Sequence, residues 1–225
     1  MKKIDVLDKG YVRLVDAMGD DRSVVNAARV SFKKESELID LHDKHLIKRL
    51  ATDGHSSPFR HAFLTFEIKA PLIVCRQWWK YVVGSDHTMD GWNEVSRRYV
   101  TEQPEYYIPD EWRNATKDKK KGSYGVREDS NIFKVQLKTL AQFASGYYLA
   151  ALEEGIAPEQ ARLFLPAYAM YTTWRWSASL QSVLWFLHQR LEDDAQYEIR
   201  QYAEAVHKLV EPRFPVSTGA FIQEE

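Results

Sequence analysis

The sequence predicts an α+β fold, with strands early in the chain and helices late. The strand signal is clearest over Phe63–Lys69, where apolar and polar residues alternate and Leu64, Phe66 and Ile68 share one face. The helical signal dominates the second half, where apolar residues recur at helical spacing. No internal repeat or flexible linker divides the chain, so we expect a single domain over residues 1–225.

Two prolines mark helix starts in the first half. Ser57-Pro58 places an N-cap residue before a proline at the first helical position, which predicts a short helix there. Pro71 follows the predicted strand and opens a second helix, which we expect to run through Trp78 and Trp79 to about Val83.

The second half opens with a long predicted helix. Ile132–Glu154 has helical spacing and stops at Gly155, which suits the left-handed conformation that closes many helices. Pro158 then starts a short helix that Pro166 ends. The stretch before the long helix, Asn114–Asn131, contains a lysine-rich run followed by Gly-Ser, and we interpret it as a solvated loop rather than a phosphate-binding segment.

Two further helices complete the predicted elements. Leu180–Leu191 is strongly apolar and reads as a buried helix. The last helix is expected to reach about Val210, and Asp193 with Gln196 resembles a capping box at its start.

Composition narrows the class of partner. Lys and Arg total 31 against 32 Asp and Glu, which argues against a broad electrostatic grip on nucleic acid or an anionic membrane and leaves a local basic pocket possible. Cys75 is the single cysteine, so no intrachain disulfide can form, and we expect it to be a small buried residue. There is no secretory signal and no apolar run near the roughly 20 residues that span a bilayer. We therefore expect a cytoplasmic protein.

The common cofactor and metal motifs are absent from the sequence. It has no Gly-rich dinucleotide or P-loop motif, no HExxH and no CxxC pair. His42 and His45 lie three residues apart on a probable helix, but no carboxylate at matching spacing completes a site. We therefore predict no metal.

The segment from Arg76 to Tyr99 is the richest in chemical groups. Gln77 and Lys80 share a helix face, so an amide and a cation point to one place. The loop that follows carries an amide, a carboxylate, a hydroxyl, two arginines and a phenol over Asn93–Tyr99. A solvated turn would explain any one of these residues, but the whole set is typical of a ligand-binding loop.

These motifs resemble the flavin-dependent thymidylate synthase (ThyX) family, which methylates dUMP with methylene-tetrahydrofolate, FAD and NADPH. The matching residues span nearly the whole chain: Asp5–Gly10, Ala27–Phe32, Gly54–His61, Arg76–Trp78, Asn93–Tyr99, Ala161–Arg162, Leu165–Pro166 and Arg190. The resemblance implies a ThyX-like fold of antiparallel strands packed with helices, and a homotetramer whose sites are shared between subunits.

The nucleotide side of the family pattern is intact. The resemblance implies that the pyrimidine nucleotide is held by Gln77, Lys80, Glu94, Ser96, Arg98, Arg162 and Arg190. It implies catalytic roles for Arg190, Ser96 and Tyr99. Arginines from separate segments can clamp a phosphate. Arg190 matches the family's activating arginine, because a cation beside uracil N3 stabilises the anion that makes C5 nucleophilic. No cysteine nucleophile is then needed, and we expect Ser96 to act through hydrogen bonds.

The flavin side departs from the pattern. The resemblance implies a cofactor-binding set of His55, Ser57, Lys80, Asn93 and Glu94. The family's Arg-His-Arg is replaced by Lys80-Tyr81-Val82, and its acid after Pro-Phe by Arg60. Its later asparagine, arginine and asparagine are replaced by Ser179, Gln181 and Trp185, and about Asp86–Gly91 is inserted. Trp185, Tyr81 and Trp92 could supply stacking on a flat ring.

The leading hypothesis is C5 methylation of dUMP to dTMP with methylene-tetrahydrofolate and a reduced flavin. The alternative keeps the uridine nucleotide but changes the reaction to hydroxymethylation or to methylation of UMP, with altered flavin use. A third hypothesis is a nucleotide-binding paralogue without turnover. Retention of Arg190 together with the Asn93–Tyr99 motif ranks it last.

Overall fold

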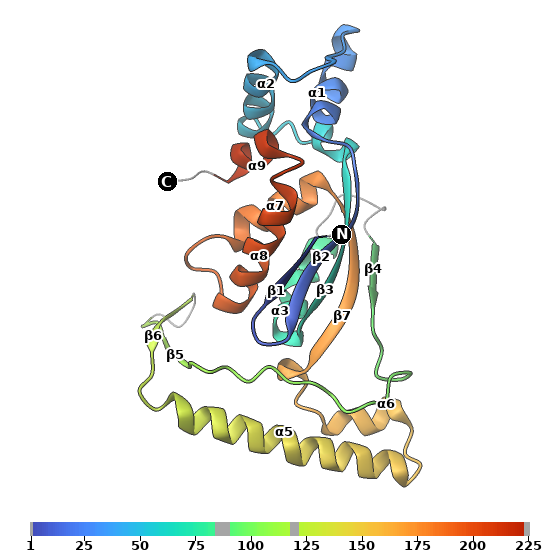
Figure 1. The fold of residues 1–225 in the computed structure, drawn as a ribbon, viewed down its shortest axis with the longest axis vertical. Coiled ribbons are helices and arrows are strands. Elements are labelled where there is room, and N and C mark those ends of the chain that lie inside the picture. The colour runs from blue at the N-terminus through green and yellow to red at the C-terminus, as the bar shows by residue number, and fades with distance from the viewer. Residues whose placement is uncertain (1, 84–90, 118–121, 223–225) are drawn as a thin grey trace.

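Five strands form one antiparallel sheet in the order β1-β2-β3-β7-β4 (Figure 1). The computed structural model describes residues 2–83, 91–117 and 122–222. The strands of this sheet are β1 (Lys3–Val6), β2 (Gly10–Met18), β3 (Phe63–Pro71), β4 (Gly91–Glu94) and β7 (Tyr171–Ser179). The predicted α+β class is confirmed, with the sheet drawn mostly from the first half and the helices mainly from the second.

The centre of the sheet pairs β3 with β7, a strand that the sequence analysis did not predict. Leu64, Phe66 and Ile68 of β3 are buried on one face, as their alternation requires. β7 pairs Trp176 with Phe66 and Trp174 with Ile68 across that face. β7 is the one strand of this sheet that comes from the second half of the chain, and it pairs with both β3 and β4.

Three helices cover the apolar face of the sheet: α3 (Leu72–Trp78), α7 (Leu180–Arg190) and α8 (Tyr197–Val210). Trp78 lies where they meet the sheet, with its ring stacked on Phe186 at a centroid distance of 4.2 Å. Trp174 and Trp176 meet the Trp78 ring edge-on, each at 5.5 Å. Part of the high aromatic content is thus core, and burial of each of these rings contributes about 1.5–3 kcal/mol, whereas other aromatic side chains are exposed.

The predicted helices after Pro71 and over Leu180–Leu191 are confirmed. Pro71 is the N-cap of α3, and a four-residue helix α4 (Lys80–Val83) follows Trp79. The short helix at Ser57-Pro58 is a 3-10 turn, η2 (Ser57–His61), whose N-cap is Ser56 rather than Ser57.

Helices gather at both ends of the sheet (Figure 1). One end carries α1 (Asp21–Arg29), η1 (Val30–Phe32), α2 (Leu41–Thr52) and α9 (Pro215–Phe221). The other end carries α5 (Ser130–Glu153) and α6 (Pro158–Ala161), followed by the turns η3 (Arg162–Phe164) and η4 (Ala167–Ala169). In the described part of the chain, no helix is both long and apolar enough to cross a membrane.

The end of α5 confirms the predicted glycine cap. Gly155 has φ +80°, its N–H donates to the Leu152 carbonyl, and the next N–H, of Ile156, donates to the Ala151 carbonyl. This is the paired closure that a left-handed residue after a helix allows.

Two local predictions are wrong. Asn114–Asn131 is not only a loop, because β5 (Arg113–Ala115) and β6 (Ser123–Val126) form a two-stranded hairpin over most of it and α5 begins at Ser130. Apart from Lys117, the lysine-rich run lies outside the described residues. The expected capping box at the last helix is also absent: Gln196 is the N-cap but makes no capping hydrogen bond, and Asp193 pairs with Arg200 at 3.1 Å. The Gln196 side chain instead forms hydrogen bonds with Gln77 and Glu198.

Candidate functional site

A cavity of about 1060 Å³ lies between α3, the end of α7, the start of α8 and the β5–β6 hairpin. Two of the predicted nucleotide-binding residues, Gln77 and Arg190, line it. The other polar side chains on its wall include Tyr107, Arg113, His188, Gln189, Gln196 and Glu198.

Arg190 is held at the cavity wall by Tyr81. Its Nε donates to the Tyr81 hydroxyl at 2.7 Å, and its guanidinium carbon lies 5.5 Å from the centroid of the Tyr81 ring. Tyr81 donates in turn to Gln189 Oε1 at 2.8 Å. Burial raises the pKa of Tyr81 more than the charge of Arg190 lowers it, so the phenol stays protonated and can donate. Among the described residues, Tyr81 is the one hydrogen-bond partner of Arg190, which leaves its terminal nitrogens for a ligand.

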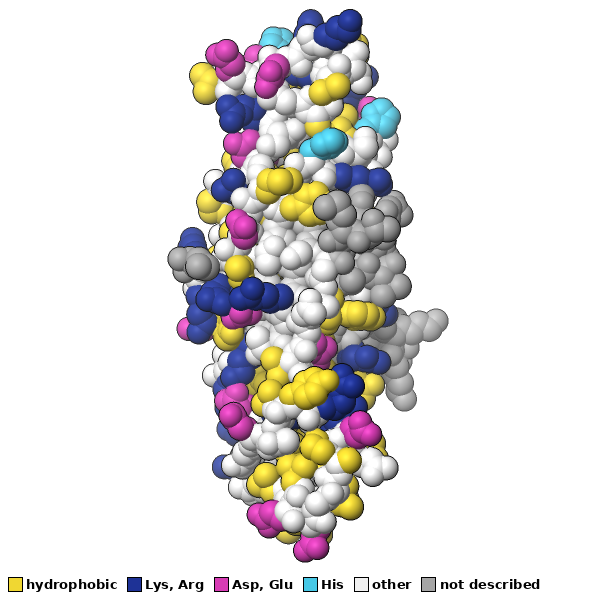
Figure 2. All heavy atoms as spheres, turned by 90° about the vertical axis from the view of Figure 1, so that its right-hand side faces the viewer, with side chains coloured by type: hydrophobic (Ala, Val, Ile, Leu, Met, Phe, Trp, Pro, Cys, Tyr) yellow, Lys and Arg dark blue, Asp and Glu magenta, His cyan; other side chains and the backbone are white. Residues whose placement is uncertain are grey.

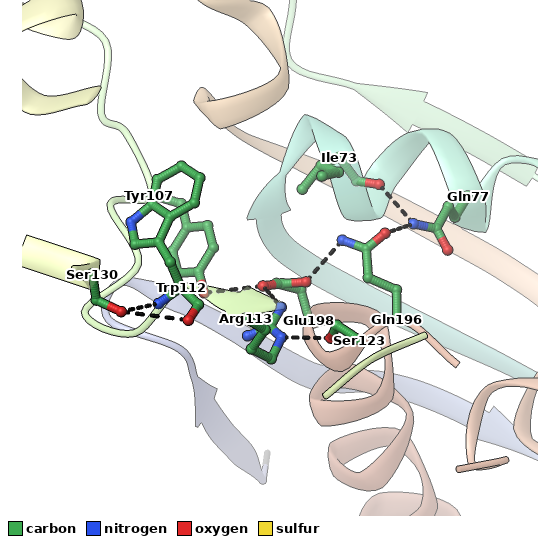
Figure 3. Close-up of polar contacts among 9 residues, drawn as sticks. All are labelled: Ile73, Gln77, Tyr107, Trp112, Arg113, Ser123, Ser130, Gln196 and Glu198. Atoms are coloured by element: carbon green, nitrogen blue, oxygen red, sulfur yellow. Dashed lines mark hydrogen bonds and ion pairs between the residues drawn. The ribbon is translucent and has the colours of Figure 1, made fainter. Parts of the chain in front are cut away.

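A chain of hydrogen bonds crosses the same cavity and ends on Gln77 (Figure 3). Glu198 accepts from Arg113 Nη2 at 2.5 Å and from Gln196 Nε2 at 2.8 Å. Gln196 Oε1 accepts from Gln77 Nε2. Burial favours the neutral acid, but hydrogen bonds from Arg113 and Gln196 and the Arg113 charge hold the pKa of Glu198 below its ordinary value. A buried carboxylate therefore anchors the chain.

A second cavity, of about 870 Å³, is lined by three more of the predicted nucleotide-binding residues. Glu94, Ser96 and Arg162 line it, together with Lys69 and Tyr171. Ala167 of η4 borders both cavities, so the turn between α6 and β7 lies between them. Within one chain, the nucleotide-binding residues implied by the family pattern are thus divided between two neighbouring cavities.

The carboxylate of Glu94 has fixed partners. Thr172 Oγ1 donates to its Oε1 at 3.1 Å, and Cys75 Sγ lies 3.7 Å from its Oε2. Burial, followed by the charge of Glu94, raises the pKa of the Cys75 thiol, so it stays protonated. Cys75 is buried as expected, and its neutral thiol acts as a hydrogen-bond donor to Glu94.

The other residues implied by the resemblance line neither cavity: His55, Ser57, Lys80, Asn93, Arg98 and Tyr99. Arg98 stays close to the second cavity through its Nε, which donates to Ser96 Oγ at 3.2 Å. Tyr99 is 78% exposed and lies under the Arg98 guanidinium at 5.3 Å. The inserted loop falls outside the described residues except for Gly91.

Three site residues, Arg113, Gln196 and Glu198, were not predicted as such from the sequence. A signal existed for Glu198, because Tyr202 and Ala205 follow it by four and seven residues on a helix face that the apolar pattern buries, and a buried acid needs partners. No signal identified Arg113, which reaches Glu198 across 85 positions of chain. Within the described residues, no cluster of three or more His, Cys, Asp or Glu could hold a metal ion.

The antiparallel sheet carries two cavities, each lined by arginine together with amide or carboxylate groups, which is the kind of site that binds a small anionic ligand. The comparisons with known proteins identify which kind. The sequence profile described as "Thymidylate synthase complementing protein" matches residues 13–216. The chain belongs to this family, the flavin-dependent thymidylate synthases, and is an enzyme.

Individual relatives agree. The flavin-dependent thymidylate synthase of Thermus thermophilus is 41% identical over 218 residues, covering 97% of this chain and 77% of its own. That of Thermosipho africanus is 39% identical, covering 97% and 93%. Among solved structures, the UMP/dUMP methylase PolB from Streptomyces cacaoi, bound with 5-Br dUMP, superposes with a TM-score of 0.83 at 29% identity and covers 97% of both chains. The same enzyme bound with 5-Br UMP gives 0.82.

Proposed function

We propose that this enzyme methylates dUMP at C5 to give dTMP, taking the one-carbon unit from methylene-tetrahydrofolate. Arg190 carries the proposal, because it lines the first cavity while the Tyr81 hydroxyl holds its Nε. A cation held beside the pyrimidine stabilises negative charge on the ring and so raises the nucleophilicity of C5. The new bond joins C5 to the methylene carbon, the bond from that carbon to folate nitrogen breaks, and the C5 proton leaves.

FAD is the proposed redox cofactor, with NADPH as its reductant. When bound, reduced flavin would supply the hydride that completes the methyl group. The imidazole of His55, the hydroxyl of Ser57, the Lys80 ammonium and the polar side chains of Asn93 and Glu94 suit a dinucleotide diphosphate and ring edge. Arg60 and Gln181, which replace a family acid and arginine, support a rebuilt contact because Arg60 Nε donates to Gln181 Oε1 at 2.7 Å.

The relatives support two candidate substrates, dUMP and UMP. The thymidylate synthases favour dUMP, whereas PolB, whose two structures hold dUMP and UMP analogues, favours the alternative of UMP methylation. The replaced flavin contacts favour the other alternative, hydroxymethylation. Incubating the protein with folate donor, FAD and NADPH, and with dUMP or UMP, followed by mass spectrometry of the product, separates these outcomes. Tight nucleotide binding without any product would instead support the silent paralogue.

We further propose the homotetramer that the resemblance implies, with sites completed between subunits. The division of the nucleotide set between two cavities supports it, since one chain alone does not gather that set. Exposed apolar side chains on α5, Phe143 and Tyr147, and Leu163 of η3 also support a covered surface. Figure 2 shows hydrophobic side chains gathered at the α5–α6 end of the molecule. Sedimentation velocity tests this directly, and a monomer at micromolar concentration would contradict it.

The single-domain organisation and the cytoplasmic location of the protein are also proposals. The single-domain organisation over residues 1–225 is supported by one main hydrophobic core that draws on residues from Val6 to Phe214. The cytoplasmic location stays a prediction from the sequence.

The first measurement for the cofactor is the visible absorbance spectrum of the protein as isolated, and again after adding FAD and desalting. A retained flavin spectrum supports FAD, and a colourless protein contradicts it.

A further inference from the structure

Hydrogen bonds fix both the main chain and the side chain of Glu94, which lines the second cavity. The N–H of the next residue, Val95, donates to the Thr173 carbonyl at 2.9 Å, so the end of β4 is tied to β7. The two carboxylate oxygens each have one donor: Thr172 Oγ1 lies 3.1 Å from Oε1, and Cys75 Sγ lies 3.7 Å from Oε2. The direction of the carboxylate is therefore set by the protein itself.

The two donors are buried side chains from different elements. Thr172 is the second residue of β7, and Cys75 belongs to α3. Each can donate one hydrogen, the threonine from its hydroxyl and the cysteine from its protonated thiol. A carboxylate has about four acceptor positions, two on each oxygen, so one on each oxygen stays open after these contacts. Because Glu94 lines the second cavity, the open positions can serve a ligand.

A carboxylate can only accept hydrogen bonds, which restricts the part of a nucleotide that Glu94 can meet. The phosphate carries the same sign of charge, and Ser96 and Arg162 of the same cavity suit it better. The base N3 lies beside Arg190, in the first cavity, under the proposed function. Besides N3–H, the donor that dUMP offers is the 3′-hydroxyl of its sugar. Glu94 therefore suits the sugar rather than the base or the phosphate.

We propose that Cys75 and Thr172 are positioning residues, which hold the Glu94 carboxylate so that it accepts the 3′-hydroxyl of the nucleotide. Without these two donors the carboxylate would rotate about its side-chain bonds, and the hydroxyl would lose an acceptor of fixed direction. Neither residue belongs to the nucleotide-binding set predicted from the sequence. The inference rests on the proposed function, because it needs a pyrimidine nucleotide whose sugar reaches the second cavity.

The test compares dissociation constants, measured by calorimetry, for dUMP and for 2′,3′-dideoxyuridine 5′-monophosphate, which lacks the 3′-hydroxyl. Thr172→Val removes one donor at nearly constant shape, and Thr172→Ser keeps it. Cys75→Ala removes the other donor and carries the test if Thr172→Val does not fold. Thr65→Val is the matched control, since Thr65 lies on β3 of the same sheet, lines neither cavity and shares a hydrogen bond with Ser177 Oγ at 2.9 Å.

The wild-type protein, Thr172→Ser and Thr65→Val are expected to bind dUMP about tenfold more tightly than the dideoxy nucleotide, the value of one hydrogen bond to a charged acceptor. In Thr172→Val and Cys75→Ala we expect this preference to shrink about threefold or more, because the affinity for dUMP falls while that for the dideoxy nucleotide stays.

Two results would overturn the inference while the proposed function stands. A purely structural role of Cys75 and Thr172 would weaken both nucleotides equally and leave the ratio of their dissociation constants unchanged. A wild-type protein that binds both nucleotides equally well would show that Glu94 does not accept the 3′-hydroxyl. If the wild-type protein binds neither nucleotide, the proposed function fails as well.

Discussion

The Nε of Arg190 donates to the hydroxyl of Tyr81 at 2.7 Å, although the two residues are 109 positions apart. Tyr81 stands where the family pattern has the histidine of Arg-His-Arg. The tyrosine still supports Arg190, because its hydroxyl accepts a hydrogen bond from the guanidinium. The same hydroxyl donates to Gln189 Oε1, which fixes the position of the phenol. The altered flavin motif and the retained nucleotide motif meet at this contact.

Removing the hydroxyl should loosen Arg190. In Tyr81→Phe we expect the turnover number with dUMP to fall about tenfold, because a hydrogen bond to a charged group is worth about 1.5 kcal/mol or more. Steady-state kinetics with all cosubstrates measures this. Tyr124→Phe, which changes an exposed tyrosine of the β5–β6 hairpin, serves as control and should retain wild-type turnover. Equal rates for the two variants would show that Tyr81 does not orient Arg190.

Arg190 itself should matter for the chemical step. In Arg190→Gln we expect turnover to fall by about a hundredfold or more, the usual loss when a preorganised charge is removed from a reacting centre. Single-turnover formation of dTMP, followed by mass spectrometry, separates this step from product release. Arg127→Gln, at an exposed ion pair with Asp129, is the control. A variant that keeps single-turnover rates within a factor of two would remove Arg190 from the mechanism.

The Arg29–Asp43 pair should make stability depend on acid pH. Burial favours the neutral acid, but hydrogen bonds from the Asp40 N–H and Arg29 outweigh it and hold the pKa of Asp43 below 3.8. Ionised Asp43 therefore stabilises the fold above the unfolded value near 3.8, and this contribution disappears as pH falls through the lower folded value. Asp43→Asn should cost about 3 kcal/mol at pH 7, since it breaks a buried pair.

Urea unfolding at pH 7, 5, 3.5 and 2.5 checks this dependence. The gap in unfolding free energy between the wild-type protein and Asp43→Asn should be constant at the two higher pH values and narrow progressively at the lower ones. Asp5→Asn, at an exposed pair with Lys3, should show almost no gap at any pH. A gap that persists undiminished at pH 2.5 would mean that the charge of Asp43 is not what stabilises α2.

Gly10 lies where the sheet meets α8 with no room for a side chain. A Cβ there would come within 1.8 Å of the Tyr202 hydroxyl, which donates to the Lys69 carbonyl at 2.8 Å, and within 2.6 Å of that carbonyl oxygen. We expect Gly10→Ala to destabilise the protein by about 1–3 kcal/mol and to lower Tm. Gly146→Ala, in the middle of α5 with open space around it, should stabilise by about 0.5–1 kcal/mol. Calorimetric melting that gives both variants the same sign would contradict this account.

The sequence by itself determined the local elements and the family. The alternation of Leu64, Phe66 and Ile68 identified β3, and Gly155 identified the end of α5, because short-range periodicity and caps depend on neighbours within one or two turns. The motif Asn93–Tyr99 carried the resemblance that the family match confirms.

Only the tertiary structure decided how the site is assembled. It placed β7 between β3 and β4, and it put Gln77 and Arg190 in one cavity and Glu94, Ser96 and Arg162 in another. It also replaced the expected cap at Gln196 with a contact to Gln77, 119 positions away. Such contacts depend on how distant segments pack. Local periodicity carries no information about which buried acid will meet which amide.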